Sequence, residues 1–287
     1  MAEIANLNGV KIHFEIHGEG IPIVYTPGSV WGLEHGRLLA EPLVEAGYQV
    51  LIHDRPNCGA SDIVIEAYAS EFDVWASYLH TLLQCLEMSP IYMCGQSSGA
   101  LLSLLMMHRY PKDVSGLFLL SPPTDNSEFW HYVGERYRAG AELADKKGML
   151  AVTEVMPWSE LIEQNPANRE RLLSMDSKNF AIMMRQWSSW MTLGRAHVAG
   201  LSDEQLRDIT THTMIVSGLR KDHPRQAAEK LHHLLPQSEL VVPSDYFSPD
   251  EMARILDGAN PSGDQEYYAG MAALLNKFIR RVEAART

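Results

Sequence analysis

The chain has 287 residues, of which 46% are hydrophobic, so it can bury a full core in one large domain or in one domain with a sizeable insertion. Its formal net charge of −12 argues against binding to nucleic acids and to anionic membrane surfaces, because both require clustered cations. The chain has three cysteines without a CxxC pair, and its start has no apolar leader, so we expect a cytoplasmic protein. No run of about 20 apolar residues occurs, so we expect no membrane span.

Strand patterns alternate with helical patterns along the first part of the chain. The stretch "KIHFEIHGEGIPIVYTPG" predicts a strand, a glycine-rich hairpin turn and an apolar strand at 21–26. Helix "GRLLAEPLVEAG", strand "YQVLIHD", helix "FDVWASYLHTLLQCLE" and strand "PIYMCG" follow, and then another helix and strand "VSGLFLLSPP". This alternation predicts a mostly parallel sheet with helices on both faces.

Strand signals stop between residues 124 and 207, where helical patterns such as "EFWHYVGERYRAGAELA" stand between polar and proline breaks. Strands resume at "TMIVSG", and helix "PRQAAEKLHHLLP", strand "SELVVP" and a final helix "GMAALLNKFIRRVEAA" follow. We therefore expect an α/β core domain at 1–123 and 208–287 and an inserted all-helical cap at 124–207.

The stretch "CGQSSGA" lies at a predicted strand-to-helix turn. Gly-x-Ser-x-Gly at such a turn exposes a serine hydroxyl at the carboxyl edge of the sheet, above the positive end of the following helix. Ser97 is therefore the candidate nucleophile, and Gly95 and Gly99 are expected because the turn leaves little room for side chains. The N–H groups of Ser98 and of Ser29, in the loop "TPGSVWG", are the expected oxyanion donors.

The chain resembles the α/β-hydrolase superfamily in four motifs, and in particular it resembles the members that carry a helical cap. "TPGSVWG" stands where the family usually has a His-Gly loop, and "DRPNCGASD" matches the Asp-Arg-x-x-x-Gly-x-Ser-Asp loop. "GQSSG" matches the nucleophile elbow, and "SGLRKDHP" matches the loop that bears the acid of the catalytic triad. The resemblance covers nearly the whole chain and implies the α/β-hydrolase fold, which hosts esterases, lactonases, amidases, C–C bond hydrolases and lyases. A serine at the elbow, where dehalogenases and epoxide hydrolases carry Asp, points to acyl chemistry.

The chain departs from the family at the catalytic base. Family members carry a histidine just after the last strand, but no histidine follows His233 in this chain. A replacement must reach within about 3 Å of the serine hydroxyl. His223, beside Asp222 on the loop after "TMIVSG", is the favoured base, and His35, at the start of the helix after the oxyanion loop, is the next candidate. His53 is expected to have a structural role.

Three carboxylates compete to orient the base. Asp222 adjoins His223, but neighbouring residues on an extended loop tend to point apart. Asp125 follows the sixth strand, which is an alternative acid position in the superfamily. These two rank about equally, and Asp245, just after the last strand, ranks below them.

The predicted cap is rich in methionine and tryptophan. At helical spacing such side chains more often pack the cap than bind a ligand, but a cap over a pocket must also line it with an apolar wall. The candidate substrate-binding residues are Trp31, His35 and Trp187. One carboxylate of a substrate could be bound by Arg55, Arg185 or Arg220.

Together these features predict a cofactor-free serine hydrolase that acts on a small, largely apolar ester or lactone through an acyl-enzyme. Two other interpretations stay open: a hydrolase-fold protein that binds a small molecule without turnover, and a C–C bond hydrolase or lyase that uses the same serine. No His-Glu-x-x-His and no Gly-x-Gly-x-x-Gly occurs, so neither a metal nor a nucleotide cofactor is implied. The expected partner is a small-molecule substrate, and a homodimer remains open.

Overall fold

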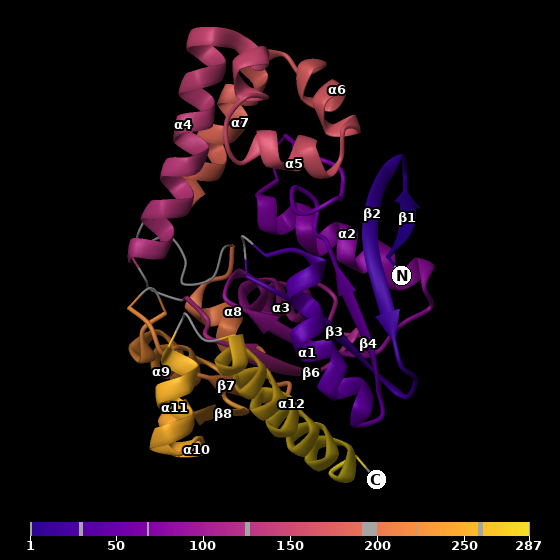
Figure 1. Cartoon of the computed structure of the whole chain (residues 1–287), viewed down its shortest axis with the longest axis vertical. Coiled ribbons are helices and arrows are strands. Elements are labelled where there is room, and N and C mark those ends of the chain that lie inside the picture. The colour runs from indigo at the N-terminus through magenta and orange to yellow at the C-terminus, as the bar shows by residue number, and fades with distance from the viewer. Residues whose placement is uncertain are drawn as a thin grey trace.

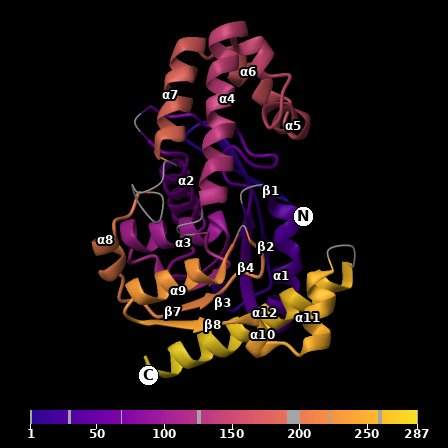
Figure 2. The same cartoon turned by 90° about the vertical axis from the view of Figure 1, so that its left-hand side faces the viewer.

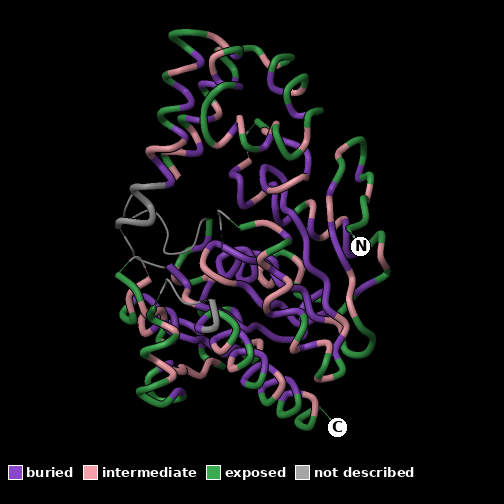
Figure 3. The backbone as a smooth tube through the Cα atoms, in the orientation of Figure 1, coloured by how far each residue is buried: buried purple, intermediate pink, exposed green. Residues whose placement is uncertain are grey.

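A computed structural model describes residues 2–28, 31–67, 69–123, 127–190, 200–221, 223–257 and 261–286, with their side chains except at 127–132 and 261–262. Figure 1 shows two parts, a sheet covered by helices and a group of helices above one end of it. Buried residues concentrate along the strands, whereas the outer surfaces of the upper helices are exposed (Figure 3).

Eight strands form one sheet in the order β1-β2-β4-β3-β5-β6-β7-β8. The pairs β1–β2 and β2–β4 are antiparallel, and all other neighbouring strands are parallel. The strands are β1 (Glu3–Leu7), β2 (Val10–His17), β3 (Ile21–Thr26), β4 (Tyr48–His53), β5 (Ile91–Gln96), β6 (Val114–Leu120), β7 (Thr213–Val216) and β8 (Ser238–Val241). The predicted α/β class with a mostly parallel sheet is confirmed.

The helices of the core are α1 (Leu33–Glu45), α2 (Glu71–Cys85), α3 (Ser98–Arg109), α8 (Asp203–Arg207), α9 (Arg225–Leu234), α10 (Pro243–Tyr246), α11 (Pro249–Leu256) and α12 (Pro261–Ala284). The upper group consists of α4 (Ser127–Val152), α5 (Trp158–Gln164), α6 (Ala167–Leu173) and α7 (Ser177–Trp190). None of these described helices combines the length and the apolar content needed to cross a membrane.

The predicted hairpin between the second and third strands is wrong. β4 lies between β2 and β3 in the sheet, so the glycine-rich turn at 18–20 connects strands that do not pair. A hairpin forms instead between β1 and β2. The two residues of its turn have positive φ angles, 54° at Asn8 and 88° at Gly9. Apolar alternation marks a strand but does not select its partner, which depends on the neighbours that the whole sheet provides.

Alternate side chains of the central strands enter two separate cores, as period-two geometry requires. Val24 and Met93 belong to the cluster under α2, α3 and α9, whereas Ile23 and Tyr92 belong to the cluster under α1 and α12. Figure 2 shows α1 and α12 on the side of the sheet opposite to α2 and α3. Because both faces of these strands are buried, only the loops at their ends can carry an exposed site.

In the predicted cap range, the described residues fold into helices. α4 and α7 lie side by side along most of their length (Figures 1 and 2), and α5 and α6 pack beside them. α8 also falls within the range 124–207, but it packs against α3 and α9 of the core. Residues 124–126 and 191–199, where the two parts are joined, lie outside the described residues.

Polar contacts fasten the cap to the core loop that follows β4. The side chain of Asn168, fully buried, donates to the carbonyls of Ser61 and Leu161 at 3.1 Å each and accepts from the Ile63 N–H at 2.8 Å. Arg171 pairs with the buried carboxylate of Asp62 at 2.5 Å. These bonds satisfy polar groups that would otherwise be buried without partners, so they fix the α5–α6 end of the cap on the core.

Candidate active site

The nucleophile elbow is the turn from β5 into α3. Ser97 has φ 54° and ψ −118°, a left-handed conformation that non-glycine residues rarely adopt, and its N–H donates to the Leu120 carbonyl at 2.9 Å. A Cβ atom at Gly95 would overlap the carbonyl of Gly99, and one at Gly99 would overlap the carbonyl oxygen of Thr26. The two glycines therefore allow the close approach that holds Ser97, partly exposed, at the carboxyl end of the sheet.

His223 lies against the Ser97 side chain. Its Nε2 atom is 2.7 Å from the Ser97 Oγ atom. The loop after β7 folds back on itself, with the His223 N–H donating to the Arg220 carbonyl at 3.0 Å. A Cβ atom at Gly218 would overlap the His223 carbonyl, so a glycine is required where the loop returns to its own strand. With Nε2 unprotonated, the imidazole can accept the serine proton.

The oxyanion donors predicted from the sequence fall partly within the described residues. Ser98 is the first residue of α3, and its N–H belongs to the first helical turn, where the helix itself offers no carbonyl partner. A Cβ atom placed on Gly28 would lie 3.8 Å from the Ser97 Oγ atom, so the loop after β3 passes beside the nucleophile. Ser29, the predicted second donor, lies outside the described residues.

Arg55 holds the oxyanion loop from below. Its guanidinium donates to the carbonyls of Pro27 at 2.6 Å, Gly28 at 2.9 Å and Trp31 at 3.1 Å. The residue is 1% exposed, and the guanidinium lies 4.6 Å from the centre of the Trp75 ring. Because its donors face the main chain, Arg55 is not available for the substrate carboxylate that the sequence suggested. This loop-holding role was not predicted from the sequence, and the Asp-Arg pair directly after a strand is the signal that could have indicated it.

The other two candidate arginines have different surroundings. Arg185, on α7, forms an ion pair with Asp145 on α4 at the surface of the cap. Arg220 lies in the turn that leads to His223. Of the two, only Arg220 lies next to a residue that contacts Ser97.

Two buried polar residues at the end of β4 support the same loop. His53 shares a hydrogen bond of 3.0 Å with the hydroxyl of Thr26. Burial is the main cause that lowers the pKa of His53 from 6.5 to about 3, and the positive charge of Arg55 is the second cause. Asp54 accepts from the N–H groups of Leu33 at 2.6 Å and Ala60 at 2.9 Å. Burial raises the pKa of Asp54. The expected structural role of His53 agrees with this neutral, fully buried environment.

Of the three candidate acids for His223, the structure describes Asp245. Asp222 and Asp125 both lie outside the described residues. Asp245 is exposed on α10, where it accepts a hydrogen bond from the hydroxyl of Ser244. Within the described ranges, no group of three His, Cys, Asp or Glu side chains is placed to hold a metal ion.

The three predicted substrate contacts have separate positions. Trp31 is 51% exposed and stacks on His35 with ring centroids 4.5 Å apart. His35 bonds through Nε2 to the Tyr268 hydroxyl at 2.9 Å, so in this structure its Nε2 is not directed to Ser97. Trp187 is only 1% exposed, and its indole N–H donates to the Ala69 carbonyl at 2.7 Å. Its ring therefore has almost no surface left for a substrate.

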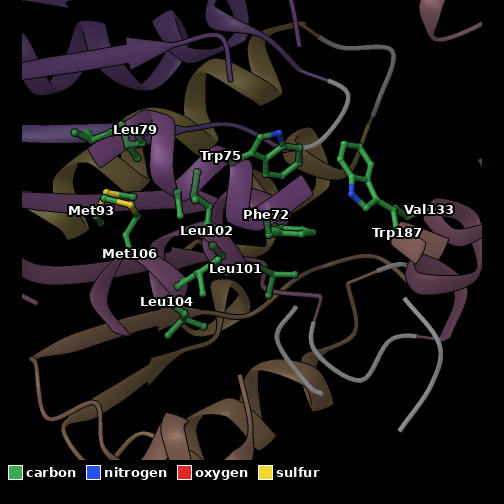
Figure 4. Close-up of a cluster of buried hydrophobic side chains, with 14 of the residues drawn as sticks. Phe72, Trp75, Leu79, Met93, Leu101, Leu102, Leu104, Met106, Val133 and Trp187 are labelled. Atoms are coloured by element: carbon green, nitrogen blue, oxygen red, sulfur yellow. The ribbon is translucent and has the colours of Figure 1, made fainter. Parts of the chain in front are cut away.

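Figure 4 shows why Trp187 is buried. Its side chain and that of Val133 extend from the cap into the hydrophobic cluster that contains Phe72 and Trp75 of α2. The edge of the Trp187 ring also meets Tyr137 of α4, with centroids 5.4 Å apart. Cap-to-core packing, which is the more common role of such residues, accounts for this one.

A cleft of about 1350 Å³ separates α1 and the loop after β4 from the cap helices α4 and α5. Trp31 and His35 belong to its core wall, and Met156, Trp158 and Arg136 belong to its cap wall. Ser97 is not among the residues that line this cleft, but Trp31 of its wall and Ser97 both lie within 4 Å of the place that a Cβ atom on Gly28 would occupy.

Sequence reasoning missed a hydrogen-bonded cluster behind the elbow. The side-chain oxygen of Gln96, the residue before the nucleophile, accepts from the hydroxyls of Tyr25 and Tyr268 at 2.8 Å each. Tyr268 also bonds to His35, which connects the elbow with the wall of the cleft. Burial raises the pKa of Tyr268 to about 12, so its hydroxyl stays protonated at neutral pH. No motif in the sequence connects residues so far apart.

Comparisons with known proteins agree with this architecture. A family model described as alpha/beta hydrolase fold matches residues 26–142. Solved structures with a similar fold include a thermophilic esterase from Thermogutta terrifontis, with 19% identity, a TM-score of 0.64 and coverage of 98% of this chain and 99% of that one. A meta-cleavage product hydrolase from Pseudomonas fluorescens IP01 has 18% identity and a TM-score of 0.61, with 97% of each chain covered.

A sequence relative is the 2-hydroxy-6-oxononadienedioate/2-hydroxy-6-oxononatrienedioate hydrolase of Escherichia coli K12. It is 32% identical over 120 residues, which are 40% of this chain and 41% of that protein. The match thus spans about two fifths of the length of this relative. The family model, the sheet order and the geometry of the elbow together show that the chain has the α/β-hydrolase fold.

Proposed function

We propose that the chain is a serine hydrolase that works through an acyl-enzyme, with Ser97 as nucleophile and His223 as general base. The observation that carries the proposal is the distance of 2.7 Å between His223 Nε2 and Ser97 Oγ at a strained strand-to-helix turn. A non-glycine residue in such a sparsely populated backbone conformation costs about 1–3 kcal/mol, and residues of this kind cluster at active sites, so φ 54° at Ser97 favours an active role.

The proposed reaction has two steps. In the first step the Ser97 oxygen bonds to the substrate carbonyl carbon while His223 takes the hydroxyl proton, and the bond to the leaving group then breaks as His223 returns that proton to it. In the second step water attacks the acyl carbon, His223 takes and returns a proton again, and the carboxylic acid leaves Ser97 free. The N–H of Ser98, and that of Ser29 as second donor, would stabilise the negative charge on the carbonyl oxygen in both steps.

A small, mostly apolar ester or lactone is the proposed substrate. The cleft next to Trp31 carries apolar side chains from both of its walls, with Leu33 and Leu38 on the core side and Met156 and Trp158 on the cap side. Such a wall favours an uncharged substrate with few polar groups. The cap helices α4–α7 are proposed to close this cleft from above.

A C–C bond hydrolase is the second candidate, because the sequence relative from Escherichia coli K12 acts on 2-hydroxy-6-oxononadienedioate. Arg136 on the cap wall supports this candidate, since a guanidinium in the cleft can pair with a carboxylate of such a substrate. The nucleophile and base would be the same. The candidates therefore differ in the substrate and not in the catalytic pair.

A side-by-side assay tests the proposal. Wild-type protein and Ser97→Ala are incubated with p-nitrophenyl butyrate and, separately, with a 2-hydroxy-6-oxo-dienoate whose conjugated absorbance is lost on cleavage. We expect wild-type turnover of the ester and none by Ser97→Ala. Faster turnover of the dienoate would favour the C–C hydrolase, and binding of both compounds without turnover would favour a non-catalytic protein.

A further inference from the structure

We propose that Trp31 is an aromatic platform that selects substrates with a flat, unsaturated group, aryl or conjugated, close to the scissile bond. This inference rests on the proposed hydrolase function and deepens it, because an apolar cleft alone would accept saturated and aromatic groups alike.

Trp31 lies near the nucleophile and belongs to the wall of the cleft. A Cβ atom on Gly28 would be 3.6 Å from Trp31 Cδ1 and 3.8 Å from Ser97 Oγ, so both side chains meet the same small space beside that glycine. Trp31 also belongs to the wall of the cleft of about 1350 Å³ under the cap. A substrate with its carbonyl at Ser97 and its chain in the cleft would therefore pass along the indole.

The indole is held in place before a substrate arrives. The Trp31 N–H donates to the Gly28 carbonyl at 3.0 Å, and the Trp31 carbonyl accepts from the buried guanidinium of Arg55 at 3.1 Å. Its ring stacks on His35 at an interplanar angle of 17°, and His35 is bonded to the Tyr268 hydroxyl. Because the main chain and one ring face are fixed, a ligand that stacks on Trp31 loses little of its binding free energy to ordering the side chain.

The open surface of the residue is unusual for its position. Trp31 is 51% exposed although it stands beside the nucleophile, and His35 already covers one face of its ring. The exposed surface therefore belongs mainly to the opposite face and to the ring edge. An aromatic ring attracts another aromatic ring through its quadrupole, beyond the apolar area that is buried, by an amount that corresponds to roughly a two- to tenfold preference. A saturated ring of similar size receives only the area contribution.

Two pairs of esters separate flatness from size. Benzyl acetate against cyclohexylmethyl acetate probes the leaving-group side, and ethyl phenylacetate against ethyl cyclohexylacetate probes the acyl side. A methylene insulates each ring from the reacting atoms, so the members of a pair are matched in intrinsic reactivity. We expect the wild type to prefer the aryl member of at least one pair by roughly two- to tenfold in kcat/KM.

Variants of Trp31 test whether the indole causes the preference for the aryl ester. Trp31→Leu should bring the aryl-to-cyclohexyl ratio close to one, and Trp31→Phe should keep part of the preference. Tyr246→Leu is the matched control, because Tyr246 is another exposed aromatic side chain, 42% exposed, on α10 and outside the cleft wall. A wild-type ratio near one for both pairs, or a ratio that Trp31→Leu does not change, would overturn the proposal.

A binding measurement keeps the test independent of catalysis. Phenylacetate and cyclohexylacetate are titrated into Ser97→Ala protein while NMR follows the indole N–H of Trp31, assigned by its loss in Trp31→Phe. We expect tighter binding of phenylacetate and a ring-current shift of this signal with phenylacetate alone. Equal binding of the two acids, or binding of neither, contradicts the platform. If no ester is hydrolysed and selective binding persists, the proposed hydrolase function fails and the platform stands.

Discussion

His223 Nε2 lies 2.7 Å from Ser97 Oγ although the two residues are 126 positions apart in the chain. Ser97 follows β5 and His223 follows β7, and only β6 separates these strands in the sheet. Loops at the carboxyl ends of nearby parallel strands meet above the same edge, which is where ligands of open α/β sheets bind. A histidine on the loop after β7 can therefore reach the elbow, although the resemblance to the superfamily led us to look after β8.

Replacement of His223 should remove most of the activity without unfolding the protein. Without an imidazole to take its proton, the Ser97 hydroxyl is a weak nucleophile, so His223→Ala should lower kcat on an activated ester by at least ~10²-fold. The matched control is His233→Ala, because His233 is exposed on α9. Steady-state kinetics on both variants check the prediction, and wild-type kcat in His223→Ala would refute the role of this base.

Replacement of Arg55 should loosen the oxyanion loop. Arg55→Met removes the donors of three main-chain carbonyls in a buried place, and we expect a loss of about 3 kcal/mol or more in the free energy of unfolding together with a lower kcat. Arg185→Met is the control, because the ion pair of Arg185 with Asp145 is exposed and should contribute less than about 1 kcal/mol. Urea unfolding compares the two, and equal losses would contradict a special role for Arg55.

The stability of the fold should fall in mild acid because of His53. In the folded protein the pKa of His53 is lowered from 6.5 to about 3. Between pH 6.5 and pH 3, His53 of the unfolded chain therefore binds a proton, whereas His53 of the folded protein does not. Stability contributed by neutral His53 is complete above pH 6.5 and is lost as the pH falls towards 3, at ~1.4 kcal/mol per pH unit. Between pH 6.5 and 5 the loss should reach ~2 kcal/mol.

The variant His53→Gln isolates this contribution. Glutamine does not titrate and can keep a hydrogen bond to Thr26, which now shares one with His53 at 3.0 Å. Urea unfolding of the wild type and of His53→Gln at pH 6.5 and at pH 5 gives, for each protein, the change in the free energy of unfolding between the two pH values. The wild type should lose ~2 kcal/mol more than the variant, and identical losses would show that another group titrates.

Asn168 should be needed to keep the cap on the core. Asn168→Ala leaves the Ile63 N–H and the Ser61 carbonyl without their buried partner, and we expect it to cost about 2–4 kcal/mol and to speed proteolysis within the cap. Asn179→Ala on α7 is the control, since Asn179 is exposed and the change should stay within about 0.5 kcal/mol. Equal protease resistance in the two variants would refute the anchoring role of Asn168.

The sequence could predict features that depend on local geometry. Gly95 and Gly99 mark the elbow because the approach of the two chains there leaves no space for a Cβ atom, and this requirement is visible in the motif itself. The position of His223 followed from strand order in the same way. The prediction of His223 used the rule that loops at one end of a parallel sheet come together, applied to the fold that the motifs implied.

Features that depend on distant packing could not be predicted. Trp187 is buried against Tyr137, whereas Trp31 is half exposed beside the nucleophile, and the sequence around the two tryptophans does not distinguish them. The hydroxyl of Tyr268 reaches Gln96 across 172 positions of sequence, and no periodicity records such a contact. Burial of this kind is decided by which surfaces meet after the strands and the cap are in place.

Covalent labelling shows directly whether Ser97 is an activated nucleophile. Wild-type protein, Ser97→Ala and His223→Ala are incubated with a fluorophosphonate and analysed by intact-protein and peptide mass spectrometry. We expect one adduct per wild-type chain, on the peptide that contains Ser97, no adduct in Ser97→Ala, and labelling at least ~10²-fold slower in His223→Ala. A wild-type protein that stays unmodified, or an adduct that persists in Ser97→Ala, would contradict this expectation.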